Sequence, residues 1–159
     1  MKWFDRFLRN WRVRKAIPHL GKAGRVLDVG CGDGTRTLTL RPNSRFQVHG
    51  LDTNSANVSK ARATVRKAGV YGPVSIDRLA GNRLPYIDGM VNLLVAEKLG
   101  DVPMTEVTRV LAPKGVAYLK QDGEWKTTVK PRPKEIDDWT HFCLLYTSDA
   151  ADDTPCVDL

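Results

Sequence analysis

The sequence predicts a single α/β domain built on a doubly wound parallel sheet of strand order 3-2-1-4-5. Short apolar runs alternate with helical patterns, and a glycine-rich turn follows the first run. The 159 residues, 42% of them hydrophobic, suffice for a core without disulfides. Alternating strands and helices form parallel units with right-handed crossovers. Such a sheet holds its ligand crevice at the carboxyl ends of the strands, where the strand order reverses.

The first half of the chain alternates strand and helix twice. The predicted elements are a strand at 25–30, a helix at 34–41, a strand at 46–51 and a helix at 54–68. Pro42 closes the first helix because proline cannot continue it. Asn54 is a suitable N-cap for the second helix, and Gly69 is a suitable stop.

The second half contributes three more strands and one helix. The strands are predicted at 74–79, 91–96 and 116–119, and the helix is predicted at 103–111. Pro103 suits the first turn of that helix. The segment Pro113-Lys114-Gly115 predicts a turn before the fifth strand.

Residues 3–16 have the pattern of an amphipathic helix in a separate N-terminal segment, residues 1–20. Aromatic and aliphatic residues recur at helical spacing among arginines, and the whole chain carries a net charge of +7. Such a helix packs against its own domain or lies on a membrane surface. The positive charge also suits an acidic partner such as nucleic acid, although charge alone names no partner.

The composition predicts a cytoplasmic protein without a metal site. No apolar run approaches the length of about 18 residues that a membrane span needs, and no secretory signal precedes the domain. The three cysteines, Cys31, Cys143 and Cys156, form no CxxC pair and have no histidine at ligand spacing. Their odd number indicates free thiols.

A glycine loop at 30–34 follows the first strand directly. Its G-x-G-x-G spacing is neither a P-loop, which ends in Gly-Lys-Ser/Thr, nor the G-x-G-x-x-G of a dinucleotide site. Asp28 lies two residues before this loop, where negative charge favours a ligand that carries an ammonium and a sulfonium over a pyrophosphate. The loop therefore opposes a nicotinamide-dependent oxidoreductase.

Asp52 ends the second strand, 22 residues after Gly30. A carboxylate at that place accepts hydrogen bonds from both hydroxyls of an adenosine ribose. Glu97, at the end of the fourth strand, and Asp101 face the same crevice and are the weak candidates for a catalytic base; Glu97 is equally suited to a structural role. The candidate cofactor-binding residues are Asp28, Gly30, Cys31, Gly32, Gly34, Asp52, Thr53 and Glu97.

Four segments together resemble the class I S-adenosylmethionine-dependent methyltransferases, of the methyltransferase type 11 kind, over residues 12–120. They are 26–34, 48–52, 84–86 and 106–115. The resemblance implies a Rossmann-like fold for residues 21–120, S-adenosylmethionine as cofactor and methyl transfer to a small-molecule acceptor. It also implies that Asp28 and the glycines hold the methionine end and that Asp52 holds the ribose.

The chain departs from this family pattern at several places. Ala80 stands where the family has an aspartate that contacts the adenine amine, with Asp77 three residues earlier, and Val91-Asn92 replaces a Phe-Asp pair. The strands that follow the fifth in the family are expected to be absent. No Asn-Pro-Pro-Tyr motif indicates methylation of a base amine. The departures favour binding over turnover, which leaves a non-catalytic S-adenosylmethionine-binding or structural module as the alternative.

The end of the chain carries two further resemblances. Residues 121–142 are expected to be a linker, and 130–142 resemble the junction that joins a methyltransferase-like segment to a quinoprotein-like β-propeller in planctomycete-like bacteria. His141 is then a junction residue. Residues 143–153 resemble a translated sequencing adapter, so 143–159 are expected to be an artefactual tail on a truncated fragment.

Overall fold

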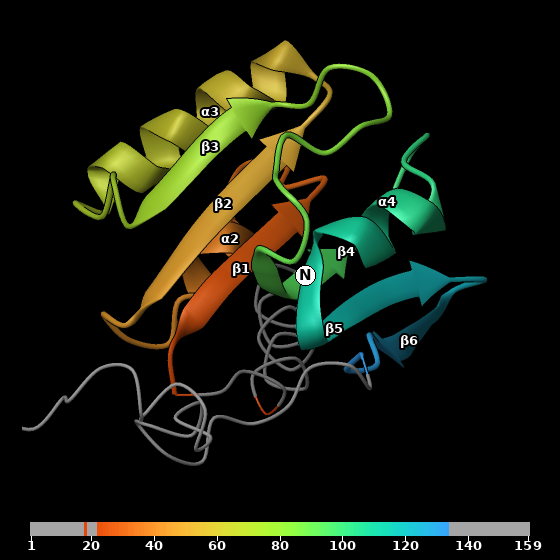
Figure 1. Cartoon of the computed structure of the whole chain (residues 1–159). Coiled ribbons are helices and arrows are strands. Elements are labelled where there is room, and N and C mark those ends of the chain that lie inside the picture. The colour runs from red at the N-terminus through yellow and green to blue at the C-terminus, as the bar shows by residue number, and fades with distance from the viewer. Residues whose placement is uncertain (1–17, 19–21, 134–159) are drawn as a thin grey trace, which may run out of the picture.

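Six strands form one sheet in the computed structural model, which describes residue 18 and residues 22–133 (Figure 1). The strand order is β3-β2-β1-β4-β5-β6. The strands are β1 (Gly24–Val29), β2 (Phe46–Asp52), β3 (Val74–Arg78), β4 (Val91–Ala96), β5 (Leu111–Gln121) and β6 (Glu124–Val129). All neighbours are parallel except β5 and β6. The order reverses at β1, so the carboxyl ends of β1, β2 and β4 meet at one edge.

Three helices lie among the described residues: α2 (Thr35–Thr39), α3 (Ser55–Lys67) and α4 (Met104–Val110). Asn54 is the N-cap of α3, as predicted, and its side chain accepts a hydrogen bond from the amide of Ala56 at 2.8 Å. Gly69 follows the C-cap of α3 with a φ of +69°, which suits glycine. In the part of the chain that is described, no helix has the length and apolarity of a membrane span.

The sheet carries an apolar core on each face. One core joins α3, through Val58 and Val65, to β2 and β3, and the other joins α4, through Val107 and Val110, to β4 and β5. Figure 1 shows α4 on the side of the sheet away from α2. Residues that alternate along one strand therefore serve opposite cores, and this fixes the register of each strand.

The predicted doubly wound α/β fold is confirmed, but the expectation that no strand follows the fifth is wrong. Residues 124–129 form β6, which pairs antiparallel with β5 inside the segment 121–142 that was expected to be a linker. Asp122 and Gly123, with φ of +52° and +84°, form the two-residue turn between them. An Asp-Gly pair is the preferred sequence for such a hairpin turn.

The predicted turn at 113–115 lies within a longer strand. The structure places 113–115 inside β5, where the pairing with β4 shifts register after Leu111. Lys114 has a φ of +63° there, so the turn signal marks an irregularity in the strand. The predicted helix at 3–16, the junction residue His141 and the tail at 143–159 lie outside the described residues.

The segment between β3 and β4 is held on the sheet by two charged residues of α4. The Glu106 carboxylate accepts a hydrogen bond from the amide of Leu84 at 3.0 Å, and Arg109 donates to the carbonyl of Tyr86 at 2.8 Å. Glu106 and Arg109 also bond each other at 2.8 Å. The segments 84–86 and 106–115, which the sequence marks separately, thus meet in space, and Leu84 is buried beneath them.

The bonds of Glu106 to Arg109 and to the amide of Leu84 should make the stability of the fold depend on pH. The bonds from Arg109 and from the amide of Leu84 lower the pKa of Glu106 from 4.5 to about 2. Because the folded-state pKa is depressed, the stabilisation is full above about pH 4.5 and is lost as the pH falls towards 2. We expect Glu106→Gln to lower the thermal midpoint at pH 7, and the difference from the parent to shrink through that window.

Thermal unfolding followed by circular dichroism between pH 2 and pH 7 measures the effect. The matched control is Glu124→Gln, which changes an exposed glutamate on β6. If the difference in thermal midpoint between the parent and Glu106→Gln stays constant from pH 2 to pH 7, the stabilising role of the ionised Glu106 is contradicted.

Candidate functional site

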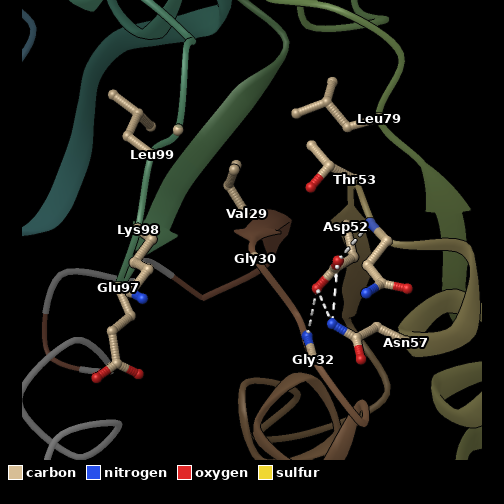
Figure 2. Close-up of a pocket in the computed structure, with 12 residues that line it drawn as sticks. Val29, Gly30, Gly32, Asp52, Thr53, Asn57, Leu79, Glu97, Lys98 and Leu99 are labelled. Atoms are coloured by element: carbon tan, nitrogen blue, oxygen red, sulfur yellow. Dashed lines mark hydrogen bonds between the residues drawn. The ribbon is translucent and has the colours of Figure 1, made fainter.

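A cavity of about 440 Å³ opens at the carboxyl ends of β1, β2 and β4. This size is in the range of small-molecule sites. Figure 2 shows Asp52, Thr53 and Asn57 on one side of the cavity and Glu97 on the other, with Gly30 between them. The crevice that the sequence predicted at this edge is therefore present.

Asp52 connects the end of β2 to the glycine loop. Its side chain is almost fully buried and accepts hydrogen bonds from the amides of Gly32 at 2.9 Å and Asn54 at 2.8 Å. The side-chain amide of Asn57 donates to both carboxylate oxygens, at 3.2 and 3.3 Å. The two backbone bonds are short, whereas the Asn57 bonds are long and shared. A ligand hydroxyl that approaches Asp52 would therefore compete with Asn57.

The glycines at 32 and 34 have different roles in the loop. Gly32 has a φ of +59°, and a Cβ built on it would meet no atom within 4 Å, so this position borders open space. A Cβ on Gly34 would come within 3.0 Å of Ala61 in α3. Gly34 therefore permits the close packing of the loop on α3, while Gly32 leaves room for a ligand next to its backbone.

Asp28 lies beneath the cavity and does not line it. Its carboxylate is fully buried and accepts from Arg36 Nη2 at 2.5 Å, from Arg36 Nε at 3.0 Å and from the Thr37 hydroxyl at 2.7 Å. Burial raises the pKa of Asp28, and the neighbouring guanidinium opposes this rise. Any effect of Asp28 on a ligand in the cavity would pass through Arg36.

Cys31 also points away from the cavity. Its side chain is buried in the core on the α3 side of the sheet, next to Gly50. Burial raises the pKa of the thiol to about 12, so it stays protonated at neutral pH. The side chain contributes packing here, and only the backbone of this residue lies in the loop.

Glu97, directly after β4, lines the cavity and is held by two cations. Its oxygens accept from Arg36 Nη1 at 3.3 Å and from Lys120 Nζ at 3.0 Å. Thr53 lines the cavity next to Asp52. Asp101 is exposed and is not among the cavity-lining residues.

Ala80 and Asn92, where the chain departs from the family pattern, are not among the residues that line the cavity. Ala80 is exposed, and Leu79 before it lines the cavity. Asn92 sits at the start of β4 and accepts a hydrogen bond from the amide of Arg25 at 2.9 Å, which ties the starts of β4 and β1 together. Asn92 therefore has a structural bond at the opposite end of the strands.

Sequence reasoning did not identify Arg36 and Asn57. A signal for Arg36 was present: an aspartate inside a buried strand needs a partner, and Arg36 is the cation in the helix that follows it. Asn57 stands in the first turn of α3, two residues after its start, and so faces the carboxylate that ends β2.

Comparison with known proteins gives one consistent result. Residues 26–115 match the family model described as "Methyltransferase domain". The chain is 32% identical over 136 residues to the "Probable methyltransferase ltbC" of Aspergillus luteorubrus, covering 76% of this chain and 47% of that protein.

Solved structures share the fold. The geranyl diphosphate C-methyltransferase of Streptomyces coelicolor, solved with S-adenosyl-L-homocysteine, aligns with a TM-score of 0.63 at 20% identity, over 72% of this chain and 46% of that chain. The [4+2]-cyclase SpnF aligns with a TM-score of 0.62 at 25% identity, over 72% and 45%. The chain thus spans about half the length of each of these proteins.

Proposed function

Because the chain belongs to the methyltransferase domain family, of the class I S-adenosylmethionine-dependent type, we propose that its cavity binds S-adenosylmethionine and that the protein transfers the methyl group to a small-molecule acceptor. The observation that carries this proposal is the pairing of Asp52 with the Gly32 amide beside open space at the strand ends. Asp52 would hold the ribose, whose hydroxyls would compete with the Asn57 amide for the carboxylate, and Glu97 marks the methionine end.

The residues present fit this donor. The cavity is large enough for a nucleoside derivative, and no side chain at position 32 obstructs the loop backbone. Val29, between the two polar ends, and Leu79, on the Asp52 side, give the cavity apolar surface. A buried carboxylate with well-placed amides beside it is the kind of polar group that fixes the orientation of a bound nucleoside.

The chemistry that the donor supplies is an in-line displacement, in which the sulfonium–methyl bond breaks, the acceptor–methyl bond forms and the sulfur keeps the bonding pair. The protein contributes mainly by positioning, since alignment alone can supply most of the acceleration. Glu97 lines the cavity and is the candidate for a catalytic base, but its bonds to Arg36 and Lys120 favour a structural role.

A second candidate function is binding of the donor without methyl transfer, in a module attached to a following domain such as a β-propeller. The ion pairing of Glu97 supports it, as does the common fold with a protein whose solved structure is described as a [4+2]-cyclase. Fold alone does not decide between these activities.

The first test is calorimetric titration of the full chain with S-adenosylhomocysteine and, separately, with NAD. We expect a single saturable site for S-adenosylhomocysteine and no heat of binding for NAD, because the loop spacing does not suit a pyrophosphate. Binding of NAD alone would overturn the proposal.

The second test separates the two candidate functions. A methyl-transfer assay with a broad panel of small acceptors is run on this chain and on a longer homologue that carries a propeller. We expect the donor to bind to this chain with little or no turnover and the longer homologue to transfer the methyl group, since an acceptor must also be held in line. Rapid turnover by this chain would support methyl transfer and would contradict binding of the donor without transfer.

A further inference from the structure

A second cavity, of about 210 Å³, lies over the amino halves of β1, β2 and β3. Its lining includes Leu27, His49 and Ser75, which stand side by side in the parallel register of these strands. Leu27 belongs to the core on the α4 side, so the cavity opens on that face of the sheet. It shares no lining residue with the cavity at the strand ends, and the fully buried Leu51 follows His49 on the same face of β2. The two cavities are therefore separate.

Tyr86, in the segment that connects β3 to β4, lines this cavity and is fixed at both ends. Its carbonyl accepts a hydrogen bond from Arg109 at 2.8 Å, and its hydroxyl bonds Nδ1 of His49. The rings of Tyr86 and His49 meet edge to face, with their centroids 5.7 Å apart. A wall that is held in this way is preformed, so a ligand would lose little free energy in ordering it.

His49 presents a neutral ring to the cavity. Its Nε2 lies 3.1 Å from the Asp77 carboxylate, which can only accept, so Nε2–H is the donor and Nδ1 accepts from the Tyr86 hydroxyl. Burial lowers the pKa of His49, and the charge of Asp77 opposes this effect. Arg62 pairs with Asp77 at 2.5 Å, so the negative charge behind the ring is already compensated. This wall therefore does not repel an anion.

Arg25 and Gln47 supply the polar end of the cavity. They lie in direct register on neighbouring strands, which are about 4.8 Å apart. Both side chains are exposed, and within the described residues neither has a hydrogen bond or an ion pair. Arg25 is the one lining residue that carries a full charge at neutral pH. A guanidinium beside an amide donor, with no carboxylate of its own, suits a ligand carboxylate.

The rest of the lining is largely apolar. Leu27, Met90 and Val91 supply aliphatic surface beside the rings of His49 and Tyr86. A dry cavity of about 150 Å³ is large enough for benzene, so this cavity has room for an aromatic ring with one small substituent.

We propose that this cavity is a second binding site, for a small aromatic carboxylate. The carboxylate accepts from the Arg25 guanidinium and the Gln47 amide, and the ring lies against Leu27 and Met90. This inference does not depend on the proposed function, because the two cavities have no residue in common.

The first experiment titrates the ¹⁵N-labelled full chain with benzoate and, separately, with benzamide, its neutral counterpart, and follows the backbone amide signals by NMR. We expect benzoate to shift the signals of Gln47 and Ser75 and to saturate below about 10 mM, as suits a ligand of this size. Benzamide should bind at least about threefold more weakly, because it lacks the charge.

The outcomes separate this site from the donor site. The absence of a saturable shift with benzoate would overturn the inference, and so would equal affinities for benzoate and benzamide. S-adenosylhomocysteine, added to a separate sample, should shift the signal of Gly32. Failure of S-adenosylhomocysteine to bind would count against the proposed function alone.

Arg25→Gln tests the carboxylate end directly. The exposed side chain has no partner within the described residues, so the variant should fold like the parent. We expect it to bind benzoate roughly three- to tenfold more weakly and benzamide as tightly as the parent does.

The matched control is Lys67→Gln, which removes an exposed positive charge at the end of α3, on the opposite face of the sheet. It should leave both affinities unchanged. Parent-like affinity of Arg25→Gln for benzoate would overturn the carboxylate site, and an equal loss for benzoate and benzamide would overturn the role of the guanidinium charge.

Discussion

Gly32→Val is expected to abolish detectable binding of S-adenosylhomocysteine while preserving the fold. Position 32 borders open space in the cavity, and a side chain there would occupy the volume next to the loop backbone. The residue also has a φ of +59°, which a β-branched side chain disfavours, so the loop would shift and weaken the bond from its amide to Asp52. Steric exclusion and loss of that bond act in the same direction.

The measurement is calorimetric titration together with circular dichroism and thermal unfolding. Gly69→Val is the matched control: Gly69 has a φ of +69°, and a Cβ on it would also meet nothing within 4 Å, but it follows α3 away from the cavity. Both variants should lose about 1–2 kcal/mol of stability to the left-handed backbone. Only Gly32→Val should lose binding, and a folded Gly32→Val protein that binds like the parent would remove the loop from the site.

The parallel sheet could be predicted closely because each of its first four strands is a short apolar run between turn signals. The predicted strand at 91–96 agrees with β4, that at 25–30 is shifted by one residue from β1, and that at 46–51 ends one residue before β2 does. Buried parallel strands are apolar on both faces, so their pattern is strong.

The edge strand β6 was missed because its signal is of another kind. Most residues of β6 are exposed. Within this strand only Trp125 packs against the core, where its ring stacks on that of Tyr118 with the ring centroids 4.7 Å apart. An exposed strand shows little hydrophobic periodicity, and its clearest mark is the Asp122-Gly123 turn. The turn residues were therefore more informative than the apolar pattern.

The candidate site could be predicted in its backbone positions and less well in its side-chain contacts. A strand end followed by a glycine loop must lie at the edge of the sheet, so Gly30, Gly32 and Asp52 were placed correctly in the cavity. Whether a carboxylate faces the ligand or another side chain depends on residues outside its own strand. Asp28 bonds the guanidinium of Arg36, eight positions further along the chain, and does not line the cavity.

Asp52→Ala is expected to weaken binding of S-adenosylhomocysteine roughly 10–150-fold, since a hydrogen bond to a charged group is worth about 1.5–3 kcal/mol. The loss has two sources, because Asp52 would accept the ribose hydroxyls and also holds the Gly32 amide in place. Asp52→Asn keeps the shape and removes the charge, but its single side-chain oxygen can accept from only one of the Gly32 and Asn54 amides. We expect it to be less stable than the parent and to bind less tightly.

The control for Asp52→Ala is Asp33→Ala, which removes an exposed loop carboxylate that bonds the amide of Thr35 and does not line the cavity. Asn57→Ala supplies the complementary measurement, because the Asn57 amide bonds the carboxylate where a ribose hydroxyl would compete. If a ribose hydroxyl displaces the Asn57 amide, Asn57→Ala should weaken binding much less than Asp52→Ala does. Parent-like affinity in both Asp52 variants, with Asn57→Ala alone impaired, would move ribose recognition from the carboxylate to the amide.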